Sequence, residues 1–271
     1  MEMPDFKPRK IAADVEGCVT PGVRSPYNLE GMAEIKTYNK MANEFYEKYG
    51  EEVFPSLFFV TGRPGSYMEG VIQAVGAMGP AFEMPSVVEN GAAYWSHNER
   101  QIKKFHPLVE DRKEDLKGVS KFVDELMGRY KMVKESGKEV CISLNPLEMR
   151  VDGLYKNIVE EFKKENLYDI VDVTHSASAV DITPKGVTKL SGLKHLLCEY
   201  DINPKDVLGV GDSKGDVEWL NYVGKAAAPL NATVDLREGV RDLWVADWED
   251  AKGFSHVLQH FVVKHKKINL S

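Results

Sequence analysis

The stretch "IAADVEGCVT", residues 11–20, leads an apolar run directly into two acidic residues, Asp14 and Glu16. The apolar part has no alternating polar residues, which is typical of a strand that is buried on both faces. Four more short apolar runs, each flanked by turn residues, have the same character and cover 56–62, 86–91, 206–213 and 225–231. The sequence therefore predicts a buried sheet whose first strand ends at a carboxylate.

Patterns with the helical period separate these runs. Apolar residues recur every three or four positions in 29–49 and again in 188–200, where they include Leu193 and Leu196. An alternation of strands and helices indicates a doubly wound parallel sheet with helices on both faces. We predict an α/β fold with a Rossmann-like core.

The middle of the chain differs in character. Between about 94 and 181 it is highly charged, and its apolar segments are more amphipathic. They suggest strands at 139–145, 168–175 and 178–182, separated by helices at 116–130 and 152–165. We interpret this segment as an inserted α+β unit. The predicted division is a core formed by 1–92 and 184–271, with the insert at 93–183.

Composition narrows the classes of function. The 271 residues include 42 acidic against 35 basic ones, a net charge of −7, which argues against a dedicated nucleic-acid surface. No run of about 18 apolar residues offers a membrane span, and the first ten residues lack the apolar core of a signal peptide. The three cysteines are far apart and suggest neither disulfides nor zinc. We expect a cytoplasmic monomer or homodimer whose partner is a small molecule.

Residues able to do chemistry follow the predicted strands. Asp14 and Glu16 follow the first strand, and Thr61 and Gly62 follow the second. The carboxyl ends of parallel strands meet at one edge of a sheet, and this edge builds the site of such folds. A hydroxyl and a backbone amide there can donate hydrogen bonds to phosphate oxygens. An aspartate in the same place can attack phosphorus.

Two later segments add a lysine and further carboxylates. "GVGDSKGDVEWL" ends a strand with Asp212 and opens a helix near Asp216, and "DITPKGVTKLSG" offers Lys185 and Lys189. Lys189 is favoured over Lys185 because it begins the apolar-periodic helix. Clustered carboxylates repel one another unless a cation intervenes, and Mg²⁺ prefers such oxygen ligands. The segments together predict phosphoryl transfer with Mg²⁺ as cofactor.

The four segments, in this order and at this spacing, resemble the four motifs of the haloacid dehalogenase superfamily of phosphatases. "DVEGCVT" is similar to its DxDGT motif, "VTGR" to its Ser/Thr motif, Lys189 to its lysine and "GDSKGD" to its GDxxxD motif. The insert resembles the αββ-type cap of the Cof-like branch, preceded by "VVENGAAYW" at 87–95. "PLNAT" at 229–233 looks most like archaeal phosphoglycolate phosphatases and sucrose-phosphate phosphatases.

The resemblance implies a role for each matching residue. Asp14 would be the nucleophile and a Mg²⁺ ligand, and Glu16 would be the general acid and base, with its backbone carbonyl on the metal. Asp212 would bind Mg²⁺, and Asp216 would either complete the metal site or orient Lys189. The phosphoryl group would be held by Thr61, Gly62 and Lys189, and weaker candidates for substrate contacts are Arg63, Asn90 and Asn231.

These roles describe a Mg²⁺-dependent phosphatase that forms an aspartyl-phosphate on Asp14. Its expected substrate is a small phosphorylated metabolite, a sugar phosphate or phosphoglycolate, chosen by cap residues around 143–150 and 175–178. Two alternatives remain, a phosphomutase or phosphotransferase of the same fold and a non-catalytic binding protein. Glu16 stands where the motif has its second aspartate. The departure adds one methylene to the acid, which bears on leaving-group protonation and substrate shape, not on metal binding.

Overall fold

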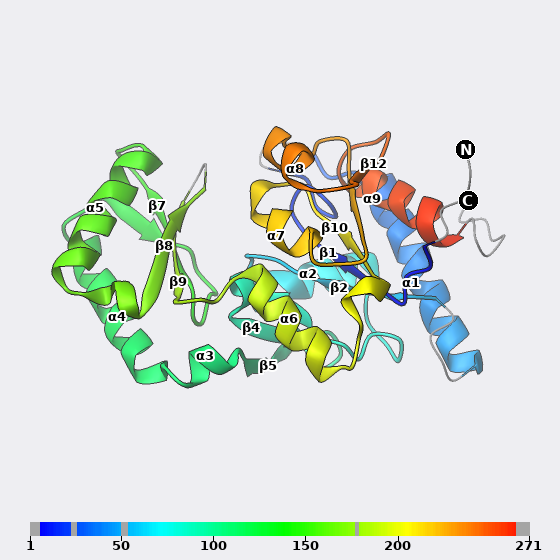
Figure 1. Cartoon of the computed structure of the whole chain (residues 1–271), viewed down its shortest axis with the longest axis horizontal. Helices are drawn as coiled ribbons and strands as arrows, with labels where there is room; N and C mark the ends of the chain where they lie inside the picture. Colours follow the sequence, from blue (N-terminus) through cyan, green and yellow to red (C-terminus); the bar gives the residue numbers. More distant parts are fainter. Residues whose placement is uncertain (1–5, 23–25, 50–53, 177–178, 264–271) are drawn as a thin grey trace.

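The computed structural model describes residues 6–22, 26–49, 54–176 and 179–263. Figure 1 shows two parts side by side, one built on a parallel sheet and one on an antiparallel sheet inserted near the middle of the chain. None of the helices in the described ranges is long and apolar enough to cross a membrane.

The parallel sheet has the strand order β12-β11-β10-β1-β2 and every neighbouring pair is parallel. Its strand β1 is in register with both neighbours, with Ile11 opposite Leu208 and Leu57. The bounds of the strands are β1 Lys10–Ala13, β2 Ser56–Phe59, β10 Val207–Val210, β11 Lys225–Ala228 and β12 Trp244–Val245. The predicted strand positions agree with the first four, whereas β12 is too short to give a sequence signal.

Helices cover both faces of this sheet. Ile11 packs in one apolar cluster with residues of α1 (Leu29–Tyr49), α2 (Gly65–Val75) and α9 (Asp250–Leu258). The neighbouring Ala12 packs in a second cluster with residues of α6 (Lys189–Glu199), α7 (Val217–Leu220) and α8 (Val234–Gly239). Successive side chains of β1 are therefore both buried, which explains why its sequence is continuously apolar.

A three-stranded antiparallel sheet adjoins this core. It consists of β3 (Ser86–Val88), β4 (Ala93–Ser96) and β5 (Gln101–Phe105), and a parallel bridge from Val60 to Val87 joins it to the chain leaving β2. We interpreted 86–91 as a strand of the main sheet, but β3 belongs to this second sheet. Because β4 and β5 pair with β3, this sheet favours an insert that begins after Phe105. The start of the insert at 93 stays a prediction.

The inserted unit, which we call the cap, has a four-stranded antiparallel sheet in the order β6-β7-β9-β8. Its strands are β6 (Met132–Lys134), β7 (Ile142–Pro146), β8 (Val171–His175) and β9 (Val180–Pro184). Helices α4 (Lys113–Met127) and α5 (Val151–Lys164) share one apolar cluster with this sheet. The prediction of an α/β core with an inserted α+β unit is confirmed.

Short helical turns complete the chain. They are α3 (Pro107–Glu110), η1 (Glu89–Gly91), η2 (Leu167–Asp169), η3 (Pro204–Asp206), η4 (Lys214–Asp216) and η5 (Gln259–Val263). The turn η1 immediately follows β3 and precedes β4.

Candidate active site

The ends of β1 and β10 bring two of the predicted carboxylates together. The strands are adjacent, with Ala13 opposite Val210, and the amide of Asp14 donates to the carbonyl of Val210 over 2.8 Å. Carboxylate oxygens of Asp14, Asp212 and Asp216 all lie within 4.8 Å of one another. Strand register alone therefore places residues nearly 200 positions apart in a single acidic cluster.

Lys189 neutralises part of this cluster. It is the first residue of α6, whose N-terminus is fixed by a reciprocal capping arrangement of Thr188 and Ser191. Its Nζ lies 2.8 Å from Asp14 Oδ2 and 2.8 Å from Asp216 Oδ1. By contrast, Lys185 pairs with Asp172 of the cap at 2.6 Å, so the lysine that the sequence favoured is the one in the cluster.

Asp216 is fully buried and its two oxygens are already occupied by protein donors. Oδ1 accepts from Lys189 and from the Trp219 indole, while Oδ2 accepts from the amides of Asp212 and Ser213 and from the Ser213 hydroxyl. Burial works against its ionisation, but Lys189 and these donors outweigh burial and lower its pKa. This arrangement suits the orientation of Lys189 better than direct contact with a metal.

The carboxyl groups of Asp212 and Asp14 are harder to ionise than those of ordinary aspartates. Burial first, and then the charges of Asp14 and Asp216, raise the pKa of Asp212 to about 8. Burial and Asp216 likewise raise the pKa of Asp14 to about 6, although Lys189 opposes this. In the described part of the chain, no hydrogen bond or ion pair reaches the Asp212 carboxylate. Three close carboxylates with one lysine are a donor set that fits a hard divalent cation such as Mg²⁺.

Two glycines permit this close approach. Gly17 has a φ of +71°, and a Cβ on it would lie 2.1 Å from Asp212 Oδ2. A Cβ on Gly211 would lie 2.7 Å from the Cβ of Asp216. Both motif glycines therefore have a packing reason, and the first also has a conformational one.

The second predicted motif follows the parallel bridge at Val60. Thr61 is buried, its amide donates to Val87 and its hydroxyl accepts from the amide of Arg63 at 3.2 Å. A Cβ at Gly62 would lie 2.7 Å from Asn90 Oδ1. Thr61, Gly62 and Asn90 all line the pocket that contains Asp14, so the structure brings these predicted residues together.

The side chains of Glu16 and Asn231 make other contacts. The Glu16 carboxylate is outside the acidic cluster and forms an ion pair with Arg63. Asn231 donates to the carbonyl of Gly17 and accepts from the amide of Asp250, each over 2.8 Å. Among the described residues it is not one that lines the pocket. We predicted a substrate contact for Asn231, but its side chain braces the loop after Asp14 instead.

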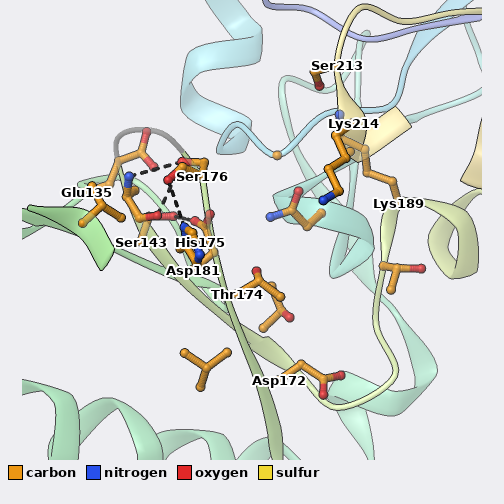
Figure 2. A pocket seen from close by; sticks show the side chains of 18 of the residues that line it. Glu135, Ser143, Asp172, Thr174, His175, Ser176, Asp181, Lys189, Ser213 and Lys214 are labelled. Carbon is orange, nitrogen blue, oxygen red and sulfur yellow. Dashed lines mark hydrogen bonds between the residues drawn. The ribbon is translucent and has the colours of Figure 1, made fainter. Parts of the chain in front are cut away.

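The pocket lies between core and cap and has a volume of about 1600 Å³. Figure 2 shows Lys189 and Ser213 on its core side and Glu135, Ser143 and Asp181 on its cap side. Both cap segments that we expect to choose the substrate contribute to the wall of the pocket. Their lining residues are Ser143, Asn145, Pro146, Met149, Arg150, His175 and Ser176. Residues 177 and 178 of the second segment lie outside the described ranges.

Sequence reasoning missed several polar residues of the cap side. Glu135, Lys138 and Asp181 line the pocket, and Lys138 is 5% exposed and lies 3.0 Å from Glu135. Glu135 and Lys138 occur in a charged stretch with no motif, and Asp181 opens a segment that we read for its lysines, so no local pattern distinguished the three from surface residues. Glu89 was also missed, although it is fully buried and lies within the quoted stretch 87–95.

Comparisons with known proteins agree with this geometry. A sequence model of the haloacid dehalogenase-like hydrolases matches residues 129–258. The chain is 25% identical over 231 residues to a phosphoglycolate phosphatase of Methanothermobacter thermautotrophicus, covering 85% of this chain and 89% of that one.

Solved structures share the fold at lower identity. One from Thermoplasma acidophilum has a TM-score of 0.68 and 19% identity, covering 94% of this chain and 99% of that chain. The sucrose-phosphatase of Synechocystis, solved with sucrose and phosphate, has a TM-score of 0.63 and 15% identity, covering 94% and 98%. The motifs, their convergence at one sheet edge and these matches agree: the chain is similar in sequence to the haloacid dehalogenase-like hydrolases over 129–258, and it shares the fold of the solved structures.

Proposed function

We propose that the protein is a Mg²⁺-dependent phosphatase that hydrolyses a small phosphorylated metabolite through an aspartyl-phosphate on Asp14. The observation that supports this most is the acidic cluster at the ends of β1 and β10. The cluster contains Asp14, which is buried and accepts a hydrogen bond from Lys189. It also contains Asp212, whose carboxylate has no partner among the described residues. Phosphatase-named relatives along most of the chain point to the same activity.

In the first step, an oxygen of Asp14 attacks phosphorus, and the bond from phosphorus to the leaving oxygen breaks. Glu16 gives its proton to that oxygen, so the product leaves as an alcohol. In the second step, Glu16 takes a proton from water, and the resulting hydroxide attacks the phosphorus of the aspartyl-phosphate. Inorganic phosphate leaves and Asp14 is regenerated. Lys189, Thr61 and the amide of Gly62 hold the phosphoryl oxygens throughout.

Asp14 and Asp212 would hold the metal, with the backbone carbonyl of Glu16 as a third ligand. When bound, Mg²⁺ supplies positive charge that offsets the carboxylates and the phosphoryl oxygens. Asp216 acts through Lys189, because its own oxygens are filled by protein donors.

The charges of the cap favour a sugar phosphate over phosphoglycolate. Each lining cation of the described cap is already in an ion pair: Lys138 with Glu135, Arg150 with Asp152 and Lys185 with Asp172. A second anionic group on the substrate would meet these acids, whereas sugar hydroxyls can donate to carboxylates and accept from the lysines. On the core side, Lys214 lines the pocket and has no ion pair in the described part of the chain. It lies two residues before Asp216 of the acidic cluster.

The test is phosphate release from a panel of phosphorylated metabolites, in Mg²⁺ and in EDTA. We expect metal-dependent release, with sugar phosphates preferred to phosphoglycolate. A strong preference for phosphoglycolate that Lys214→Ala abolishes would contradict the charge argument while leaving the phosphatase intact. Formation of an isomeric sugar phosphate by NMR, without free phosphate, would favour a mutase. No turnover of any substrate would leave only a binding protein.

A further inference from the structure

We propose that Glu135 of the cap, acting through Arg63, is a positioning residue for the carboxyl group of Glu16. The cap would then contribute to proton transfer as well as to substrate choice. This inference rests on the proposed function, because it assigns Glu16 the acid and base role described above.

The Arg63 guanidinium bridges two carboxylates that come from different parts of the molecule. One terminal nitrogen, Nη2, pairs with Oε1 of Glu16, which follows β1 of the core. The other, Nη1, lies 2.7 Å from Oε1 of Glu135, which follows β6 of the cap. All three side chains line the pocket and are less than two-fifths exposed. The planar fork of arginine fixes the direction of both contacts at once.

Glu135 is itself held in place. Its second oxygen, Oε2, lies 3.0 Å from the buried Nζ of Lys138. Burial disfavours its charge, but Lys138 and Arg63 outweigh burial and lower the pKa of Glu135. Figure 2 shows Glu135 beside Ser143 on the cap side of the pocket. An arginine held by a fixed carboxylate loses little further entropy when it binds a second one, which distinguishes it from an ordinary surface pair.

The loop that carries Glu135 is fixed to the core by Glu89. The buried Glu89 carboxylate accepts hydrogen bonds from three successive cap amides, those of residues 139, 140 and 141, at 2.8–2.9 Å. The amide of Glu89 donates to the carbonyl of Arg63 at 3.1 Å. Nearby, a Cβ on Gly137 would lie 2.5 Å from the Ser66 hydroxyl of α2. The cap loop and the backbone of Arg63 are therefore fastened to the same buried residue.

This arrangement accounts for the glutamate in the first motif. A glutamate has one more methylene and one more torsion than an aspartate, so its carboxyl group needs an additional constraint to stay aligned. The ion pair with Arg63 provides that constraint, and Glu135 holds Arg63. A displaced general acid slows only reactions whose leaving group needs protonation, and a misplacement of about 1 Å can cost ~100-fold.

The test compares two substrates in the full-length protein with Mg²⁺: the best sugar phosphate and p-nitrophenyl phosphate, whose leaving group departs without a proton. For Glu135→Gln we expect kcat to fall by about tenfold or more on the sugar phosphate and by much less on p-nitrophenyl phosphate. Arg63→Lys, which keeps the charge but loses the fork, should give the same pattern, and the double variant should add little. Glu114→Gln is the matched control, because Glu114 forms an exposed cap ion pair with Lys117, away from the segments expected to choose the substrate.

Several results would overturn the inference. An equal loss on both substrates would make the role one of binding or structure. Unchanged kcat on the sugar phosphate in both variants would remove the role altogether, and so would fully additive losses in the double variant. Thermal unfolding shows whether each variant is folded. If one of Glu135→Gln and Arg63→Lys does not fold, the kinetics of the other test the inference. In all these cases the wild-type protein remains a phosphatase, whereas a wild-type protein inactive on both substrates would remove the proposed function as well.

Discussion

Asp212→Asn should stabilise the metal-free protein at alkaline pH. The folded-state pKa of Asp212, about 8, lies well above the value near 4 of an unfolded chain. Between these pH values the native state binds more protons than the unfolded state does. The free energy of unfolding therefore falls as the pH rises from about 4 to about 8, and asparagine, which cannot ionise, removes this loss.

The size of the effect follows from the shift. A difference of about four pKa units corresponds to at most about 6 kcal/mol, at ~1.4 kcal/mol per unit. Structural relaxation and coupling to Asp14 reduce this, and we expect roughly half, about 3 kcal/mol. For a chain of this length the melting temperature should rise by about 5–10 °C.

The assay is thermal unfolding in EDTA at pH 8 and pH 5, followed by addition of Mg²⁺. Asp212→Asn should raise the melting temperature at pH 8, change it little at pH 5 and abolish the stabilisation that Mg²⁺ gives the wild type. Asp206→Asn is the control, because Asp206 precedes the same strand at its other end and its side chain forms, within the described ranges, only a distant pair with Arg9. A lower melting temperature at pH 8, or an undiminished Mg²⁺ response, would refute the reasoning.

Three further substitutions test the same site. Asp14→Asn should abolish phosphate release while the protein stays folded by circular dichroism, and persisting turnover would exclude Asp14 as the nucleophile. Glu16→Gln should lower kcat far more than Mg²⁺ affinity measured by calorimetry, since the proposed metal contact is the backbone carbonyl; a comparable loss of affinity would contradict that contact. Lys189→Met should destabilise the metal-free protein by about 3 kcal/mol at pH 8, because it leaves buried carboxylates unpaired. Melting curves should show partial recovery at pH 5, where Asp14 is protonated, and an equal loss at both pH values would argue against this electrostatic origin.

The core and its four motifs could be predicted because their signals are local. The run at 11–13 is apolar because both faces of β1 are covered, and the helix at 29–49 shows its period directly. Asp14, Thr61, Lys189 and Asp212 each follow a strand or begin a helix, so a parallel sheet brings them to one edge.

Other features had no such signal. Strand β5, "QIKKF", was missed because it is partly exposed and mixes charged with apolar residues. The bracing role of Asn231 depends on its contacts with Gly17 and Asp250, which are distant in sequence. The division of roles between Asp212 and Asp216 also required the structure, because it depends on which oxygens already accept protein hydrogen bonds.

The sequence by itself determined the class of fold, the edge of the sheet that carries the chemistry and the residue types there, since strand patterns and motif order are properties of short segments. Only the tertiary structure decided how core and cap meet. The contacts of Glu89 with three cap amides and of Arg63 with Glu16 and Glu135 join positions about 50 to 70 residues apart. Backbone amides and bridging charges have no periodicity along the chain, so their pairing exists only once the two parts are folded together.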